Sequence, residues 1–96
     1  MVGPNVRLEG DVLVGMGSLL DHDGIVGRHA TIGAGSTIGA ETHIEDCAFV
    51  GDGVVVLAER HIGLGSVVIS GSVVTQDIPP GSIAAGVPAR LIRRKR

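Results

Sequence analysis

A histidine flanked by two carboxylates is the pattern in this sequence best suited to acid–base chemistry. His22 stands between Asp21 and Asp23, and Gly24 follows, a composition typical of a turn. A turn would leave the imidazole accessible, and the carboxylates would favour its charged form. An imidazole oriented by an acid can accept a proton from a hydroxyl or an amine, as a general base does. The alternative is an exposed turn histidine without a chemical role.

Positive charge is concentrated at the C-terminus. All ten acidic residues precede Arg90, together with three of the eight lysines and arginines, whereas residues 90–96 contain the other five cations. A basic tail of this kind can bind phosphate groups, nucleic acid or an acidic partner. It can equally be a solvated, frayed end. Because no aromatic residues or further basic surface accompany the tail, nucleic acid is not expected as a partner.

Aliphatic residues recur at every sixth position, and the structure that they form must position these groups. Four places after each aliphatic residue of the period the side chains are mostly small or β-branched, with Arg60 as the clear exception. A period of six suits strands rather than a 3.6-residue helix, and the glycine that often follows the aliphatic residue suits a tight turn with relaxed φ. The pattern predicts a parallel β-solenoid. The aliphatic positions are Val2, Leu8, Val14, Leu20, Val26, Ile32, Ile38, Ile44, Val50, Val56, Ile62, Val68 and Val74.

The repeated unit, clearest over residues 26–39, resembles the hexapeptide repeat of the left-handed parallel β-helix. The resemblance implies three units per triangular coil, so that residues eighteen apart stack, and a little over four coils. The expected fold is all-β, with a left-handed β-helix over residues 1–79 and a C-terminal loop and basic tail over residues 80–96. Pro79 and Pro80 are expected to stop the strand ladder, leaving residues 83–90 as a loop.

The stretch GSVVTQDIPPGSIAAGVPAR, residues 71–90, is the most specific in the chain. It resembles the C-terminal signature of hexapeptide-repeat acyltransferases that use acetyl-CoA. The resemblance implies that Gly86, Ala89 and Arg90 line the pantetheine arm of CoA, with Arg93 and Arg94 near its phosphates. Small residues permit close backbone approach, and guanidinium groups pair with phosphate in a planar fork. The alternative is a C-terminal cap that carries an arginine tail.

The segment around His22 resembles the region of the catalytic histidine in bacterial sialic acid O-acetyltransferases and related nucleotide-sugar N-acetyltransferases. The resemblance implies that His22 is the general base and Asp23 its orienting acid. Ala40 lies eighteen residues further on, and its backbone N–H is expected to stabilise the oxyanion that develops on the thioester. The predicted function is transfer of an acetyl group from acetyl-CoA to a hydroxyl or amine of a small, sugar-derived acceptor.

The family also implies a homotrimer with active sites in clefts between adjacent prisms. Its members carry an N-terminal domain that binds the sugar nucleotide. This sequence lacks a counterpart, so a partner domain supplied elsewhere is expected to select the acceptor. With a single cysteine, no signal peptide and no apolar run long enough to cross a bilayer, the chain is expected to be cytoplasmic and to have no membrane partner.

Two other functions remain open. His43 and His61 are eighteen apart, so the predicted coil stacks them, and a neighbouring subunit could add a third metal ligand, as in the γ-class carbonic anhydrases on the same fold. His22 and His29 are a second such pair across a subunit interface. Stacked surface histidines are the simpler interpretation, and no metal is expected. The chain could also be a non-catalytic trimeric scaffold without a substrate domain.

Overall fold

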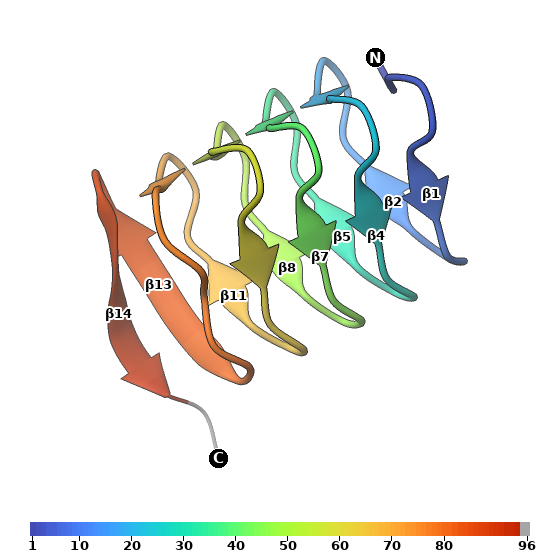
Figure 1. The fold of residues 1–96 in the computed structure, drawn as a ribbon. Coiled ribbons are helices and arrows are strands. Elements are labelled where there is room, and N and C mark those ends of the chain that lie inside the picture. The colour runs from blue at the N-terminus through green and yellow to red at the C-terminus, as the bar shows by residue number, and fades with distance from the viewer. Residues whose placement is uncertain (95–96) are drawn as a thin grey trace.

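The computed structural model describes residues 1–94, which form short strands joined by tight turns. Twelve two-residue strands are followed by two longer ones (Figure 1). They are β1 (Arg7–Leu8), β2 (Leu13–Val14), β3 (Leu19–Leu20), β4 (Ile25–Val26), β5 (Thr31–Ile32), β6 (Thr37–Ile38), β7 (His43–Ile44), β8 (Phe49–Val50), β9 (Val55–Val56), β10 (His61–Ile62), β11 (Val67–Val68), β12 (Val73–Val74), β13 (Ser82–Gly86) and β14 (Ala89–Arg94). No helix among these residues is long and apolar enough to span a membrane.

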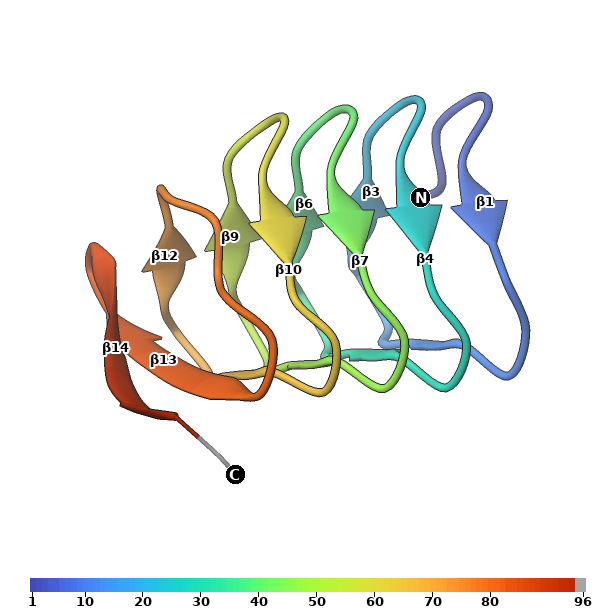
Figure 2. The same cartoon turned by 60° about the horizontal axis from the view of Figure 1, so that its bottom comes forward.

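The strands stack into three sheets that form the sides of a prism. Face 1 contains β1, β4, β7 and β10, face 2 contains β2, β5, β8, β11, β13 and β14, and face 3 contains β3, β6, β9 and β12. Neighbouring strands from β1 to β12 are parallel and pair with a register of eighteen residues, as in Ile25 with His43. Figure 2 shows the coils side by side along the prism. The predicted left-handed parallel β-helix is confirmed.

The interior is a ladder of the aliphatic residues that recur every sixth position. From Leu20 to Val74 each of these side chains is at most 3% exposed. Buried serines satisfy backbone groups at one corner, since Ser36 Oγ donates to the Gly51 carbonyl at 2.8 Å and accepts the Val54 N–H at 3.2 Å. Burial of this apolar surface, with its polar groups paired, is the main stabilisation of the coil.

The glycine that follows the aliphatic residue is needed because adjacent coils pack too closely for a side chain. It does not supply the relaxed φ expected from the sequence. A Cβ at Gly33 would lie 2.6 Å from the Asp52 nitrogen of the next coil, which is too close for any side chain. The left-handed backbone falls two residues later, where φ is 69° at Gly35, 60° at Asp23 and 59° at Glu41. Asp tolerates this conformation better than most residues because its short polar side chain bonds locally.

The C-terminal segment differs from the expected loop. Residues 82–86 form β13, which pairs in parallel with β11, and β14 returns antiparallel to β13. The ladder therefore continues past Pro79 and Pro80. The irregularity lies earlier, because Val74 pairs with Val56 eighteen residues before it, whereas Ile78 pairs with Ile62, only sixteen before it.

This shortened corner, residues 75–77, also accounts for Arg60. Ile78 takes an interior position and is 5% exposed, although the six-residue count placed it among the small corner residues. Arg60 lies one coil before the shortened corner and fills the space beside it. Its Nη1 donates to the Thr75 carbonyl at 3.4 Å, and its Nε lies 3.8 Å from Asp77 Oδ1.

Candidate functional site

His22 lies in the turn that leads from β3 on face 3 to β4 on face 1. We call this edge of the prism the His22 corner; it comprises residues 21–24, 39–42, 57–60 and 75–77 in successive coils. Asp23 adopts the left-handed conformation, and its Oδ2 lies 2.8 Å from His22 Nδ1. Both side chains are about half exposed, at 47% and 48%. The pair is therefore preorganised by the turn while the opposite nitrogen of the ring, Nε2, remains available for chemistry.

The backbone on either side of the imidazole is held by hydrogen bonds. The His22 N–H donates to Asp21 Oδ1 at 2.8 Å, and the His22 carbonyl accepts the Glu41 N–H of the next coil at 2.9 Å. Asp21 thus has a structural role within the turn, whereas Asp23 contacts the ring. The structure places Asp23, the acid predicted to orient His22, against the ring.

The surrounding carboxylates raise the pKa of His22 above the usual value for histidine. The hydrogen bond to Asp23 is the largest cause, desolvation opposes it, and the negative charges of Asp21, Asp23 and Glu41 add to the rise. A raised pKa makes the neutral imidazole a stronger base. Glu41 was not among the predicted site residues, although its position eighteen residues after Asp23 could have indicated it.

The Ala40 amide differs from the Arg28 and Ala34 amides, which stand at the same turn position of other units. At the same turn position, the N–H groups of Arg28 and Ala34 each donate at 2.9 Å to the carboxylate of an aspartate in the next coil, Asp46 and Asp52 respectively. Ala58 stands at that place above Ala40, and its methyl group accepts no hydrogen bond. Within residues 1–94 the structure shows no protein acceptor for the Ala40 N–H.

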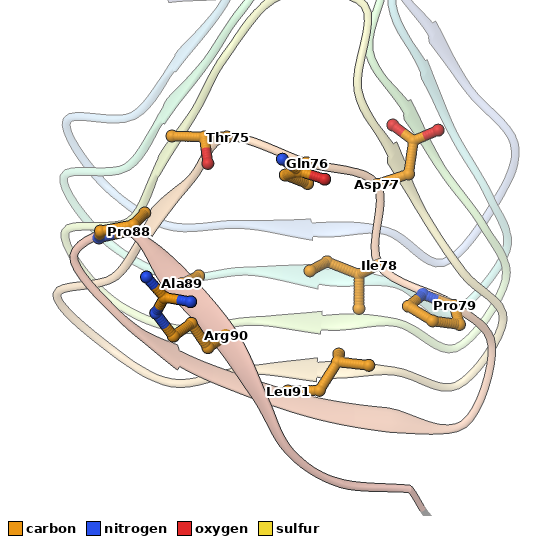
Figure 3. Close-up of a pocket in the computed structure, with 9 residues that line it drawn as sticks. All are labelled: Thr75, Gln76, Asp77, Ile78, Pro79, Pro88, Ala89, Arg90 and Leu91. Carbon is orange, nitrogen blue, oxygen red and sulfur yellow. The ribbon is translucent and has the colours of Figure 1, made fainter.

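A cavity of about 460 Å³ opens at the C-terminal end of the same corner (Figure 3). Ala89 and Arg90 of the predicted CoA set line it, on β14, opposite Asp77 and Pro79. The complete lining is Thr75, Gln76, Asp77, Ile78, Pro79, Pro88, Ala89, Arg90 and Leu91. In Figure 3 the side chains of Ile78 and Leu91 point toward one another, and both are apolar members of the lining.

Gly86, the third predicted CoA residue with a described environment, does not line this cavity. Gly86 ends β13 with a φ of 111°, and its N–H donates to Ser72 Oγ at 3.1 Å. Arg93 and Arg94 belong to β14, but their side chains lie outside the described residues. Of the three members of the predicted set whose side-chain environment the structure describes, Ala89 and Arg90 line the cavity and Gly86 does not.

The His22 corner connects His22 with the rim of the cavity. Ala40, Ala58 and the Thr75–Asp77 turn follow His22 in successive coils along this edge. Since neighbouring parallel strands lie about 4.8 Å apart, three coils separate the imidazole from the rim by roughly 14 Å.

The other histidines lie elsewhere on the prism. His43 and His61 stack on face 1, with ring centroids 4.8 Å apart. His29 occupies the corner between faces 1 and 2, with its Nδ1 3.8 Å from Asp11 Oδ2. Within one chain His22 and His29 are therefore on different corners and do not share a site.

Comparison with known proteins places the chain among acyltransferase sequences. Over 89 residues it is 37% identical to the UDP-3-O-acylglucosamine N-acyltransferase of Methylorubrum extorquens strain PA1, a match that covers 86% of this chain and 25% of that protein. Over 78 residues it is 45% identical to the bifunctional protein GlmU of Rubrobacter xylanophilus, covering 74% of this chain and 17% of that protein. No protein-family model matches the chain.

Solved structures show the same fold. The serine acetyltransferase of Brucella abortus strain S19 matches with a TM-score of 0.84 and 28% identity over 94% of this chain and 40% of that chain. AntD, an N-acyltransferase of Bacillus cereus in complex with dTDP and 3-hydroxybutyryl-CoA, matches in fold with a TM-score of 0.76 and 17% identity over 99% of this chain and 72% of that chain.

The fold and its repeat define the class of protein. The sequence relatives are hexapeptide-repeat acyltransferases and the structural neighbours are left-handed β-helix acetyltransferases, which confirms the resemblance inferred from the repeat. The chain spans a quarter or less of the length of these two curated relatives.

Proposed function

We propose that this chain transfers an acetyl group from acetyl-CoA to a hydroxyl or amine of a small, sugar-derived acceptor. One observation carries the proposal: His22 is held by Asp23 at 2.8 Å on an exposed corner, one coil from the Ala40 amide, which has no protein acceptor within residues 1–94. A base and a backbone donor on the same edge are the two groups that acyl transfer from a thioester requires. The names of the sequence relatives support acyl transfer as the reaction.

In this mechanism the neutral His22 accepts the acceptor's proton at Nε2. Asp23 holds the proton on Nδ1 and so selects the tautomer that leaves Nε2 free. The acceptor oxygen or nitrogen attacks the thioester carbonyl, and the Ala40 N–H stabilises the oxyanion of the tetrahedral intermediate. The intermediate then collapses, the carbon–sulfur bond breaks, and the imidazolium returns its proton to the departing CoA sulfur.

The cofactor is proposed to follow the His22 corner toward the C-terminal cavity. The thioester would lie beside His22 and Ala40, and the pantetheine arm beside Ala58 and the cavity rim. Ala89 permits close approach, and the Arg90 guanidinium offers a fork of donors to a phosphate oxygen. Gly86, Arg93 and Arg94 complete the proposed CoA set, with the two arginines near the phosphates.

The assembly is proposed to be a homotrimer in the cytoplasm. Exposed apolar side chains on two faces support association, since Leu13 and Phe49 project from face 2 and Leu19 and Val55 from face 3. Such packing would place the His22 corner of one prism against its neighbour and close a cleft for the acceptor. The match covers a quarter of the glucosamine acyltransferase, and acceptor selection is proposed to involve an N-terminal domain or a partner in addition to this cleft.

Ligand binding and CoA release test this function. Acetyl-CoA should raise the melting temperature, because a ligand that binds only the native state stabilises it, whereas acetate at equal concentration should not. Release of free CoA thiol should then depend on an added amino sugar or hydroxyl sugar, alone or linked to a nucleotide. If acetyl-CoA causes neither stabilisation nor protection of Arg90 from chemical modification, the chain is a scaffold and the proposal fails.

A further inference from the structure

We propose that His43, Glu45 and His61 on face 1 bind a divalent transition-metal ion of the Zn²⁺ class. We call these residues the imidazole cluster. From the sequence no metal is expected here, and a third ligand could come only from a neighbouring subunit. The structure brings Glu45 of the same chain to the two histidines, so one prism supplies three ligands. This site is separate from the His22 corner and does not depend on acyl transfer.

The register of the β-helix places the two imidazoles together. His43 on β7 pairs directly with His61 on β10, and their rings stack with centroids 4.8 Å apart and an interplanar angle of 20°. Glu45 Oε2 lies 2.5 Å from His61 Nε2. One ligand atom from each of the three residues lies within 4.8 Å of the others.

A small side-chain movement converts this arrangement into a coordination sphere. Ligand atoms around one zinc ion lie roughly 3 to 3.5 Å apart, because each is about 2.1 Å from the metal. In the cluster, the 2.5 Å between Glu45 Oε2 and His61 Nε2 lies below this range, and the upper limit of 4.8 Å for the three ligand atoms lies above it. The side chains of His61 and Glu45 are 46% and 35% exposed, so rotation about their χ angles meets little steric resistance. The backbone, fixed by the strand pairing, already has the required spacing.

The surroundings of Glu45 leave room for a metal ion. The residues eighteen before and after it are Gly27 and Gly63, so no side chain stands directly beside Glu45 in the same position of the adjacent coils. A hollow of about 360 Å³ borders Glu45, His61 and Gly63 and extends to Asp77 and Pro79. This hollow can hold water or another small ligand in the fourth position.

The chemistry of the three groups specifies the class of ion. Two imidazoles and one carboxylate form a borderline-soft set that suits Zn²⁺, Co²⁺, Ni²⁺ and Cu²⁺, whereas Mg²⁺ and Ca²⁺ prefer oxygen ligands alone. Three protein ligands and one open position are the arrangement of accessible zinc sites. The ion would join β7 to β10 and thus fasten two adjacent coils.

Cobalt and zinc titrations of the full chain test the site. After treatment with EDTA and removal of the chelator, Co²⁺ should give the visible d–d absorption of a four-coordinate ion, and Zn²⁺ should displace it at one ion per chain. The substitutions His43→Ala, His61→Ala and Glu45→Gln should each weaken metal affinity at least about tenfold. Glu45→Gln retains the shape of the side chain and therefore separates a lost ligand from a lost fold.

His29→Ala is the matched control, because His29 also lies beside a carboxylate, that of Asp11, on a different edge. His22→Ala serves as a second control and should keep the metal affinity of the wild type, whatever its effect on turnover. Binding that survives both His43→Ala and His61→Ala, or that His29→Ala weakens equally, would overturn the proposal. Absence of the cobalt spectrum in the wild-type protein would do the same.

Discussion

The His22 corner and the imidazole cluster both combine histidine with a carboxylate, but the fold assembles them differently. At the corner, His22 and Asp23 are neighbours in sequence, and a left-handed turn brings their side chains to 2.8 Å. On face 1, His43 and His61 are eighteen residues apart and meet only because β7 and β10 pair in register. Local geometry forms the first site, and the repeat of the coil forms the second.

The two regions also offer different chemical groups. On face 1 the backbone is occupied, since the His43 N–H donates to the Arg60 carbonyl and the His61 N–H to Asp77 Oδ1. Face 1 therefore offers side chains alone to a ligand, which suits the binding of a metal ion. At the corner the Ala40 N–H has no acceptor among the described residues, so the turn offers backbone as well as side chains. A reaction that develops an oxyanion favours the corner.

The largest expected effect is the loss of turnover in His22→Ala. Removing a general base should lower kcat about 10²- to 10⁴-fold while acetyl-CoA affinity stays close to that of the wild type. The measurement is CoA thiol release at saturating acetyl-CoA. His29→Ala is the control, because that exposed histidine lies on a different corner and should retain full activity. Equal losses in both variants would contradict the distinction between the corner and the rest of the prism.

Ala58→Asp would give the Ala40 amide the acceptor that Asp46 and Asp52 supply to their own neighbours. Occupying this donor should lower kcat about 10²- to 10³-fold, the cost of losing one oxyanion hydrogen bond. Ala34→Asp, at the same turn position of another corner, should leave kcat unchanged. Urea unfolding of both variants checks that the coil is intact. Full activity of Ala58→Asp would remove the Ala40 amide from the mechanism.

Arg90→Ala tests the C-terminal end of the corner. Loss of a charge-assisted hydrogen bond to phosphate, worth about 1.5 kcal/mol, should raise KM for acetyl-CoA roughly tenfold with little change in kcat. Arg7→Ala removes an arginine that pairs with Glu9 at 3.3 Å in the first coil and should leave KM unaltered. An effect on kcat but not on KM would place Arg90 at the chemical step and not at the cofactor.

Asp23→Asn should have the smallest effect, a shift of the pH profile. The wild-type pKa of His22 is raised mainly by Asp23, so activity should fall as pH decreases through a value above that of an ordinary histidine. Asn removes the charge and most of the stabilisation of the imidazolium, which lowers this pKa and moves the acidic limb of kcat/KM to lower pH. A profile identical to that of the wild type would show that Asp23 does not act on the titrating group.

Much of the architecture could be predicted because the six-residue period reports directly on burial. Residues such as Ile32, Ile44 and Val56 are buried by the same geometry in every coil, so one unit describes all of them. The C-terminal hairpin could not be predicted in this way. The corner at 75–77 is two residues shorter than the corners of earlier coils, and this shortening shifts Ile78 into the core. A prediction based on a fixed six-residue period cannot detect such a change.

The candidate site likewise contains residues that the sequence could indicate and residues that it could not. His22 and Asp23 could be assigned from their adjacency, and Ala40 from the eighteen-residue coil that the family resemblance supplied. Glu41 was missed although it lies eighteen residues after Asp23, a spacing that the coil repeat makes meaningful. Glu45 was missed because its contact with His61 depends on how side chains from two coils turn toward each other, which no sequence spacing records.

What the sequence determined by itself is the repeat: which residues face inward, where the chain turns, and which turn carries the histidine between two acids. This follows because the aliphatic period and the turn residues act locally, within each unit. The tertiary structure alone decided which amides remain without acceptors and which carboxylate reaches which imidazole. Those outcomes depend on stacking between coils, where the identity of one residue, such as Ala58 above Ala40, decides whether a backbone donor is occupied or available.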